Sequence, residues 1–325
     1  MNDLLHFSIR DRIIEYPVYQ SAVSRLERLH RRALASGQPG GLLVTGLSGA
    51  GKTTVRDEYE RRFPKVDEGT VTCIPVLCVD TPAAPTVKNL AEAILIALGD
   101  PMSHRGSAER KTQRICAYLR LCKVEMLLID EFQHFVEHGH RNEVRQVTDW
   151  LKSLINHAAI PVVLFGLPEC KQVLQLNSQL ARRFSAQYYL RPFQFESEEE
   201  IQEFRGVLHA VEQLLPLPSV PLSTPNMAQR FFYATNGLID YICKITDGAV
   251  QAAHYRGSSH LDTAIYAEAF EEEVWREVSP ALNPFLAGSG LRPLTRPGEP
   301  FALMCQPCQA LDDSRDRGRR AKVKL

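Results

Sequence analysis

The stretch "GLLVTGLSGAGKTT", residues 41–54, decides the fold of this chain. Its apolar opening predicts a buried strand, and Gly46, four residues, Gly51, Lys52 and Thr53 complete the spacing G-x-x-x-x-G-K-[ST]. Glycines let successive backbone N–H groups turn toward phosphates, and the helix predicted to start near Lys52 adds the positive end of its dipole. A strand, a glycine-rich loop and a helix in this order predict a phosphate-binding loop.

The loop gives each of its polar groups an expected role. Lys52 is expected to reach the β- and γ-phosphates of ATP, and the Thr53 hydroxyl is expected to ligate Mg²⁺. The predicted nucleotide-binding residues are Gly46, Ser48, Gly49, Ala50, Gly51, Lys52, Thr53 and Thr54. ATP and Mg²⁺ are therefore the predicted cofactors.

A second motif, "MLLIDE" at 126–131, is an apolar strand that ends in two acids. Asp130 is expected to hold Mg²⁺ through water, and Glu131 to activate the attacking water. An apolar-Asp-Glu sequence is weak by itself, but it becomes informative on a parallel strand that follows a phosphate loop. The pair predicts hydrolysis of a nucleoside triphosphate, because a kinase would not need Glu131 placed for water.

The third candidate element is "QLARRF", residues 179–184, which follows the fourth predicted strand. An arginine at a subunit edge can reach the γ-phosphate held by a neighbouring subunit and act as an arginine finger. Arg183, or Arg182 beside it, is the catalytic candidate. Surface ion pairs formed by these two arginines are the alternative interpretation.

Strands and helices alternate through the first two thirds of the chain. The predicted strands are 41–45, 71–80, 125–130, 160–166 and 186–193. Short, continuously apolar strands separated by helices predict a parallel sheet covered on both faces. After Phe195 the pattern changes to helices only, which predicts a small helical domain.

These patterns predict four parts of the chain. They are an N-terminal helical extension (1–36), an α/β nucleotide-binding core (37–195), a helical lid domain (196–278) and an irregular, basic C-terminal tail (279–325). The tail is rich in proline and glycine, and we expect it to be loose or dependent on a partner.

The three motifs together resemble the AAA+ ATPases. That resemblance implies an α/β AAA+ P-loop NTPase fold, with a five-stranded parallel sheet covered by helices and a small helical lid domain after it. Within the superfamily, "YPVYQSAVSRLERL", "LLVTGLSGAGKTT", "LLIDEFQHF", "IPVVLFGLPE" and "QLARRF" look most like the TniB/TnsC transposition regulators, relatives of MuB.

The resemblance implies an ATPase that acts as a bacterial, cytoplasmic transposition regulator. Its members form ATP-dependent homo-oligomers, rings or filaments of about six or seven subunits. They wrap double-stranded DNA independently of its sequence and recruit a transposase. Members from CRISPR-associated transposons also bind a TniQ-type targeting protein.

Two positions depart from the AAA+ pattern. Gly166 stands at the end of the fourth strand, where a polar sensor is usual, and the usual lid arginine would fall near Asp240 and Lys244. Both departures predict slow ATP hydrolysis, with ATP acting mainly as an assembly switch.

A basic segment, residues 101–124, is the predicted DNA-binding element. It carries six lysines and arginines against the single acid Glu109, a net charge of +5. In the resembling family, elements between the second and third strands line the DNA channel. The candidates are Arg105, Arg110, Lys111, Thr112 and Arg114, followed by Arg141 and Arg145. A solvated helix face is the alternative.

The amino-acid composition excludes few classes of protein. Lys plus Arg and Asp plus Glu number 38 each, so any nucleic-acid surface must be local. The pair Cys305 and Cys308 has no partner motif that would complete a zinc site, and its role is open. No signal peptide or membrane span is visible, so we expect an intracellular protein without membrane contact.

The sequence is also compatible with other functions. A replication initiator or helicase loader is another DNA-acting AAA+ ATPase, although an initiator would normally append a winged-helix domain for which 279–325 is too short. A small-molecule P-loop kinase would leave Glu131 and the arginine pair without a purpose. A signalling NTPase switch would normally carry sensor or repeat domains.

Overall fold

The computed structural model describes residues 6–137 and 141–302. These residues fall into two compact units. The sheet unit contains residues 21–46, 52–137 and 141–190, and the helical unit contains residues 6–20, 47–51 and 191–302. Residues 6–20 and 47–51 therefore belong to the same unit as the C-terminal helices. The four consecutive parts predicted from the sequence do not include such a grouping.

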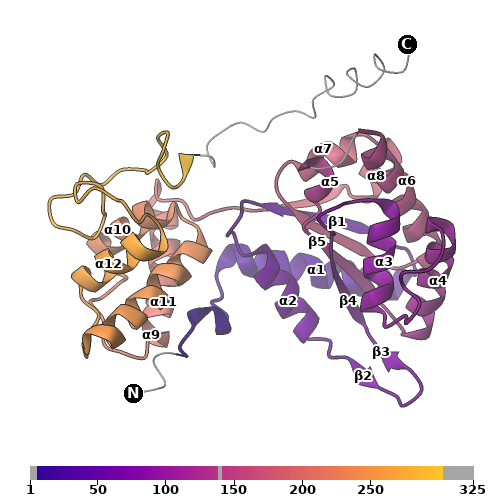
Figure 1. Cartoon of the computed structure of the whole chain (residues 1–325), viewed down its shortest axis with the longest axis horizontal. Helices are drawn as coiled ribbons and strands as arrows, with labels where there is room; N and C mark the ends of the chain where they lie inside the picture. The colour runs from indigo at the N-terminus through magenta and orange to yellow at the C-terminus, as the bar shows by residue number, and fades with distance from the viewer. Residues whose placement is uncertain (1–5, 138–140, 303–325) are drawn as a thin grey trace, which may run out of the picture. The chain divides into compact units, whose positions relative to one another are not determined.

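Five parallel strands form the sheet, in the spatial order β4-β5-β6-β1-β7. Figure 1 labels β1, β4 and β5 of this sheet. They are β1 (Gly41–Gly46), β4 (Val76–Asp80), β5 (Met126–Asp130), β6 (Val162–Gly166) and β7 (Ala186–Leu190). The predicted five-stranded parallel sheet is confirmed. Because parallel strands end at the same edge, the last residues of the neighbouring strands β5, β6 and β1 share the edge where such sheets bind ligands.

The second predicted strand, 71–80, is shorter than expected. β4 begins only at Val76, while β3 (Thr72–Cys73) pairs antiparallel with β2 (Val66–Asp67). Pro75 separates the two pieces, and its ring nitrogen has no hydrogen to donate to a sheet ladder. A single strand through 71–80 was therefore wrong.

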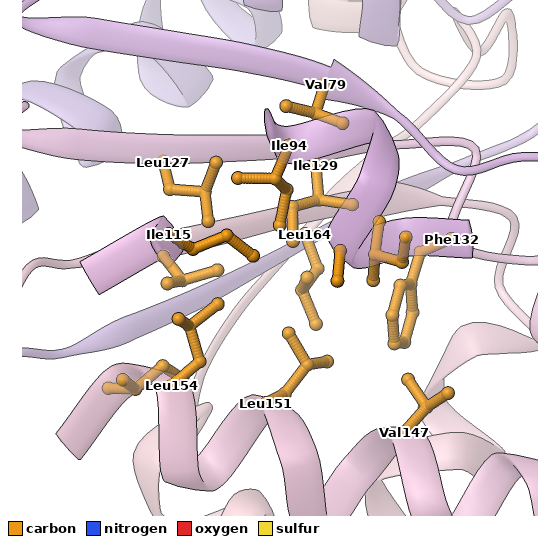
Figure 2. Close-up of a cluster of buried hydrophobic side chains, with 14 of the residues drawn as sticks. Val79, Ile94, Ile115, Leu127, Ile129, Phe132, Val147, Leu151, Leu154 and Leu164 are labelled. Atoms are coloured by element: carbon orange, nitrogen blue, oxygen red, sulfur yellow. The ribbon is translucent and has the colours of Figure 1, made fainter. Parts of the chain in front are cut away.

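Helices cover both faces of the sheet. Those between residues 17 and 190 are α1 (Pro17–Ser36), α2 (Lys52–Arg61), α3 (Val87–Ala97), α4 (Ala108–Leu121), α5 (His134–Glu137), α6 (Arg141–Ala158), α7 (Cys170–Gln175) and α8 (Ser178–Arg183). Figure 2 shows Leu127, Ile129 and Leu164 packed with side chains from α3, α4 and α6. Leu128 and Val163, which alternate with them, are also fully buried. Burial on both faces explains why the strands read as continuous apolar runs.

The helical unit confirms the helical region predicted after Phe195. Its elements are the short 3-10 helix η2 (Ile9–Asp11), α9 (Glu198–Leu214), α10 (Pro225–Thr235), α11 (Ile239–Arg256) and α12 (Thr263–Glu273). α9 begins with a capping box in which the Ser197 hydroxyl accepts the N–H of Glu200 and the Glu200 carboxylate accepts the N–H of Ser197.

Residues 279–302 differ from the expectation of a loose tail. They are irregular, but Phe285 packs against Phe231 and Tyr266, and Phe301 packs against Tyr241 with no exposed surface. The sequence contains the apolar anchors, but their proline-rich surroundings gave no periodic pattern. The basic end of the chain and the Cys305–Cys308 pair lie outside the described residues.

Candidate functional site

The predicted phosphate loop lies between the end of β1 and the start of α2. Gly49 has φ +78° and Gly51 has φ +91°. This left-handed region strains any residue with a side chain, so the glycines follow from the backbone path of the loop. α2 starts directly after it at Lys52, and the first N–H groups of a helix have no partner within the helix. The loop therefore provides the N–H donors that an anion requires.

Lys52 is almost fully buried at the start of α2, with 7% of its surface exposed. Its Nζ donates a hydrogen bond of 2.9 Å to the carbonyl oxygen of Gly46. Burial lowers the pKa of Lys52, while the carboxylates of Asp130 and Glu131 act in the opposite direction. The ammonium thus lies at the end of β1 in the field of the two acids that follow β5. The other side chains of the motif that carry hydroxyls are exposed, namely Ser48, Thr53 and Thr54.

Asp130 is the buried acid of the site, with 1% of its surface exposed. Its Oδ1 accepts the N–H of Glu131 at 2.8 Å, and its Oδ2 accepts the Thr53 hydroxyl at 3.2 Å. Burial raises the pKa of Asp130, and the hydrogen bonds and a nearby arginine oppose that rise. Lys52 and Asp130 are 78 residues apart in the sequence, and the two motifs that contain them therefore meet in one site.

The oxygens of Asp130 and Thr53 fit a magnesium ion. Mg²⁺ prefers hard oxygen ligands, and it is usually bound through one or two carboxylates plus water and substrate phosphates. Within the described ranges, no group of three or more His, Cys, Asp and Glu side chains is arranged to hold a metal. A magnesium ion at Asp130 would therefore depend on nucleotide phosphates for further ligands, as expected of an ATP·Mg²⁺ site.

Arg56 on α2 is a site residue that the sequence interpretation missed. Its Nη1 lies 3.1 Å from Asp130 Oδ2, and its guanidinium also pairs with Asp57 and Asp80. Although burial disfavours its charge, the carboxylates of Asp130, Asp57 and Asp80 raise the pKa of Arg56. Its spacing of three residues from Thr53 places both on one side of α2, which is the signal that could have identified it. Arg56 gives the buried Asp130 a permanent countercharge.

Glu131 follows directly after β5 in an uncommon backbone conformation. Its φ is +54°, a region that few residues other than glycine adopt. Its side chain is 41% exposed, and its carboxylate accepts a hydrogen bond from Gln133 Nε2. Strained backbone conformations concentrate at functional sites, where the surrounding structure holds them. Gln133 is the second residue that the sequence interpretation missed, because no pattern in "DEFQ" distinguishes it.

The two candidate finger arginines end α8 but differ in their contacts. Arg183 is half-buried, and its Nη2 donates to Asn156 Oδ1 on α6. Arg182 is exposed, and it has no hydrogen bond or ion pair with any residue in 6–137 or 141–302. Of the two, Arg182 is therefore the side chain not engaged within the described residues, whereas the sequence interpretation placed Arg183 first.

Asp240, at the predicted lid position, contacts the phosphate loop within the helical unit. The N–H of Asp240 donates to the carbonyl oxygen of Gly49 at 3.1 Å. Its carboxylate pairs with Arg10 at 2.5 Å and with Lys244 at 2.9 Å. The loop is thus joined to α11 and to the segment that contains η2. The position at which the sequence analysis expected the lid arginine thus holds an acid paired with two cations.

The structure corrects part of the predicted DNA-binding set. Lys111 is fully buried, and its ammonium donates to Glu92 at 2.7 Å and to the carbonyl oxygen of Ser103. The Thr112 hydroxyl is held between Ala108 and Trp150. Lys111 cannot contact DNA without unfolding its surroundings, so this assignment was wrong for Lys111.

Arg114 is also engaged inside the protein. Its Nη2 donates to the carbonyl oxygens of Met102 and Arg105 and lies 3.2 Å from Asp100 Oδ2. The guanidinium therefore holds the turn before α4, and it is a poor candidate for a phosphate contact. Periodicity and charge alone could not have separated it from Arg110.

Three candidates remain exposed without a side-chain partner in the described part of the chain. They are Arg105, Arg110 and Arg145. Arg110 lies on α4 and Arg145 on α6, and these two helices pack together. Arg141 begins α6, but its side chain lies outside the described part.

Comparison with known proteins identifies the family. The profile of the bacterial TniB protein family matches residues 5–194, more than half of the chain. The chain belongs to the TniB family. No curated protein matches it. The matched range contains the phosphate loop, the Asp130–Glu131 strand end and the arginine pair of α8.

Solved structures show the same fold. The chain is similar to the ORC2 protein of Aeropyrum pernix in its ADPNP-ADP complexes, with TM-score 0.62 and 16% identity over 83% of this chain and 72% of that one. It is also similar to Aeropyrum pernix ORC1 in complex with DNA (TM-score 0.60, 17% identity, 80% and 66% covered) and to Cdc6p of Pyrobaculum aerophilum (TM-score 0.57, 14% identity, 83% and 71% covered). Family and fold together make this TniB-family protein an ATPase with an AAA+ fold.

None of the helices in the described residues is long and apolar enough to cross a membrane.

Proposed function

We propose that this TniB-family ATPase is a transposition regulator that oligomerises on double-stranded DNA. In this role it links the selection of a target site to the recruitment of a transposase. The observation that carries the proposal is the family match over residues 5–194, which spans the whole candidate ATPase site. A TniQ-type targeting protein and the transposase are the proposed protein partners.

The residues of the site have the following proposed roles. The N–H groups of the loop and the Lys52 ammonium hold the phosphates, while Thr53 and Asp130 hold Mg²⁺. When bound, the metal withdraws charge from the phosphoryl oxygens. Glu131 orients the attacking water and takes its proton, and Arg182 of an adjacent subunit completes the site. Such a site can act only in an oligomer, which makes nucleotide state and assembly interdependent.

The proposed DNA surface consists of Arg105, Arg110 and Arg145. Exposed guanidinium groups without internal partners are free to contact phosphates, and such contacts do not depend on base sequence. The similar ORC1 structure is a complex with DNA, which agrees with a DNA-acting role. At such low identity, however, that likeness shows the fold alone.

A replication initiator or helicase loader is the second candidate, because the chain shares its fold with the ORC and Cdc6 proteins. Both candidates require ATP and DNA. They differ in the protein that the oligomer recruits, a transposase in one case and a replicative helicase in the other. The family match decides our preference for transposition.

Assembly is the direct test of the proposed function. Purified protein would be mixed with a short DNA duplex and with ADP, ATP or a non-hydrolysable ATP analogue, then imaged by negative-stain electron microscopy. Lys52→Ala is the test variant, and Lys65→Ala removes an exposed lysine as the matched control. Rings or filaments that require triphosphate and DNA, and that disappear only in Lys52→Ala, are the expected result. A monomer that ignores DNA with every nucleotide would exclude the proposal.

A further inference from the structure

One buried amide joins the ends of two neighbouring strands beside Glu131. Gln133 is 6% exposed, and its Nε2 donates to Glu131 Oε2. Its Oε1 accepts the N–H of Leu167, the residue directly after β6, at 3.2 Å. A carboxylate can only accept and a backbone N–H can only donate, so these partners settle which end of the amide is nitrogen. Gln133 therefore connects Glu131 after β5 to the end of β6.

Gly166 provides the space that this amide occupies. A Cβ atom at position 166 would lie 2.9 Å from Gln133 Oε1 and 2.4 Å from Cys170 Sγ. Both distances are too short for real contacts, so any side chain at 166 would displace Gln133 or Cys170. The end of β6 has no polar side chain of its own because the Gln133 amide fills that place.

Gln133 donates the one hydrogen bond that the Glu131 carboxylate accepts from the described residues, since His134 Nε2 lies 3.9 Å from Oε2, too far for a second one. The Glu131 side chain is 41% exposed, and its main-chain N–H is already bonded to Asp130. Without the amide, the carboxylate could rotate toward solvent among several rotamers. A hydrogen bond from a buried group fixes one of them, which is how supporting residues orient catalytic groups.

We propose that Gln133 is a positioning residue for ATP hydrolysis in this chain. Its amide holds the Glu131 carboxylate in the orientation that activates water, and it replaces the polar side chain that β6 lacks. Gly166 is then part of the hydrolytic site. This inference rests on the role of Glu131 in the proposed function.

The sharpest test is Gln133→Glu, which changes one atom of the bridge. The introduced carboxylate keeps an oxygen for the N–H of Leu167 but loses the donor to Glu131 and places a second negative charge beside it. We expect kcat to fall about 10- to 100-fold at pH 8, with the affinity for a fluorescent ATP analogue unchanged. As the pH falls, protonation of the introduced carboxyl group restores a donor, so the deficit relative to the parent protein shrinks. Gln213→Glu makes the same chemical change at an exposed position of α9 and serves as the control.

A second variant approaches the bridge from the other strand. Gly166→Ala in a Cys170→Ala background removes the sulfur contact and leaves the contact with the amide as the main conflict. We expect a loss of kcat similar to that of Gln133→Ala, and no further loss when the two are combined. Non-additive losses are expected when two changes break one interaction. Thermal unfolding of each variant checks that the chain is folded.

The outcomes separate the inference from the proposed function. Glu131→Gln is the reference: if it hydrolyses ATP at the parent rate, the role of Glu131 fails, and the proposed mechanism fails with it. If Glu131→Gln is inactive while the Gln133 variants keep or exceed the parent kcat, only the positioning role is overturned. A pH-independent loss in Gln133→Glu, or one that follows lost ATP affinity or lower unfolding temperature, would also overturn it.

Discussion

The strand-end site and the basic segment 101–124 were both predicted from the sequence, but their side chains make different kinds of contact. At the strand end, contacts bring functional groups together: the Thr53 hydroxyl and the Arg56 guanidinium both donate to the Asp130 carboxylate. In the basic segment, ion pairs within the protein neutralise some of the charges, since Lys111 pairs with Glu92 and Lys123 with Glu68. A motif with fixed spacing predicts where groups meet. A charge count predicts how many charges exist, but not which of them remain available.

The two adjacent arginines at the end of α8 show the same contrast between an engaged and an unengaged side chain. Replacing the unengaged one is expected to give the largest effect on kcat. Arg182 has no internal partner in the described residues, whereas Arg183 is bonded to Asn156. We expect Arg182→Ala to lower the kcat of DNA-bound assemblies by about 1,000-fold, because an arginine finger stabilises the charge of the transition state. Arg183→Ala should retain most of the activity. ATP turnover at saturating nucleotide and duplex DNA measures both.

A mixing experiment shows whether Arg182 acts between subunits. Arg182→Ala and Glu131→Gln are each expected to be inactive, but a mixed oligomer contains interfaces with both intact groups. Partial recovery on mixing supports a finger supplied in trans. Loss of activity in Arg183→Ala, with Arg182→Ala active, would make Arg183 the finger. It would also show that the lack of a partner within the chain does not identify the functional arginine.

The strand-end half of the comparison predicts that Asp130→Asn is inactive although it is nearly isosteric. The change removes the charge that would bind Mg²⁺ and leaves Arg56 with one carboxylate fewer. We expect kcat to fall about 100-fold or more and the Mg²⁺ concentration for half-maximal turnover to rise. Glu271→Gln makes the same carboxylate-to-amide change at an exposed position of α12 and is the matched control. An unchanged Mg²⁺ requirement would contradict the assignment of Asp130 as the metal ligand.

Much of the fold could be predicted from the sequence, and the reason is local. Each central strand is a short apolar run buried on both faces. The phosphate-loop motif in addition predicts a strand before it and a helix after it. The grouping of residues 6–20 with α11 was not predictable, because it depends on contacts such as Ser8 and Ile9 with Asp247. Contacts between residues so far apart in the chain leave no periodic signal.

The same limit applies to the candidate site. Lys52, Thr53, Asp130 and Glu131 follow from motifs whose spacing the chemistry requires. Gln133 acts through a contact with the residue that follows a neighbouring strand, and only the structure reveals it. Arg56 could have been suspected from its spacing to Thr53 on α2, but its contact with Asp130 is seen only in the structure. Gly166 shows the difference most clearly: from the sequence it is a missing polar residue, whereas in the structure it provides the space for one.

The buried lysine of the basic segment is expected to have a smaller effect, on stability rather than on DNA binding. Lys111→Met keeps most of the side-chain volume but removes the donor to Glu92 and to the Ser103 carbonyl. Since a group left without its hydrogen-bond partner is costly, we expect the free energy of unfolding to fall by about 2 kcal/mol. Affinity of the folded protein for DNA should not change. Urea unfolding and DNA titration measure the two quantities, with the exposed Arg110→Ala expected to show the opposite pattern. A DNA defect without loss of stability in Lys111→Met would restore it as a DNA contact.

The smallest effect is expected from the arginines that the comparison leaves free. Each phosphate contact to duplex DNA adds about 0.9 to the slope of log affinity against log salt. If Arg105 and Arg110 each contact a phosphate, the double variant Arg105→Ala/Arg110→Ala should lower that slope by about 2, equally for unrelated DNA sequences. Arg12→Ala/Arg276→Ala removes the same charge from exposed positions of the helical unit and should leave the slope unchanged. Equal slopes for both double variants would mean that the basic segment is a solvated helix face. The DNA surface would then have to lie elsewhere, with Arg145 as the next residue to replace.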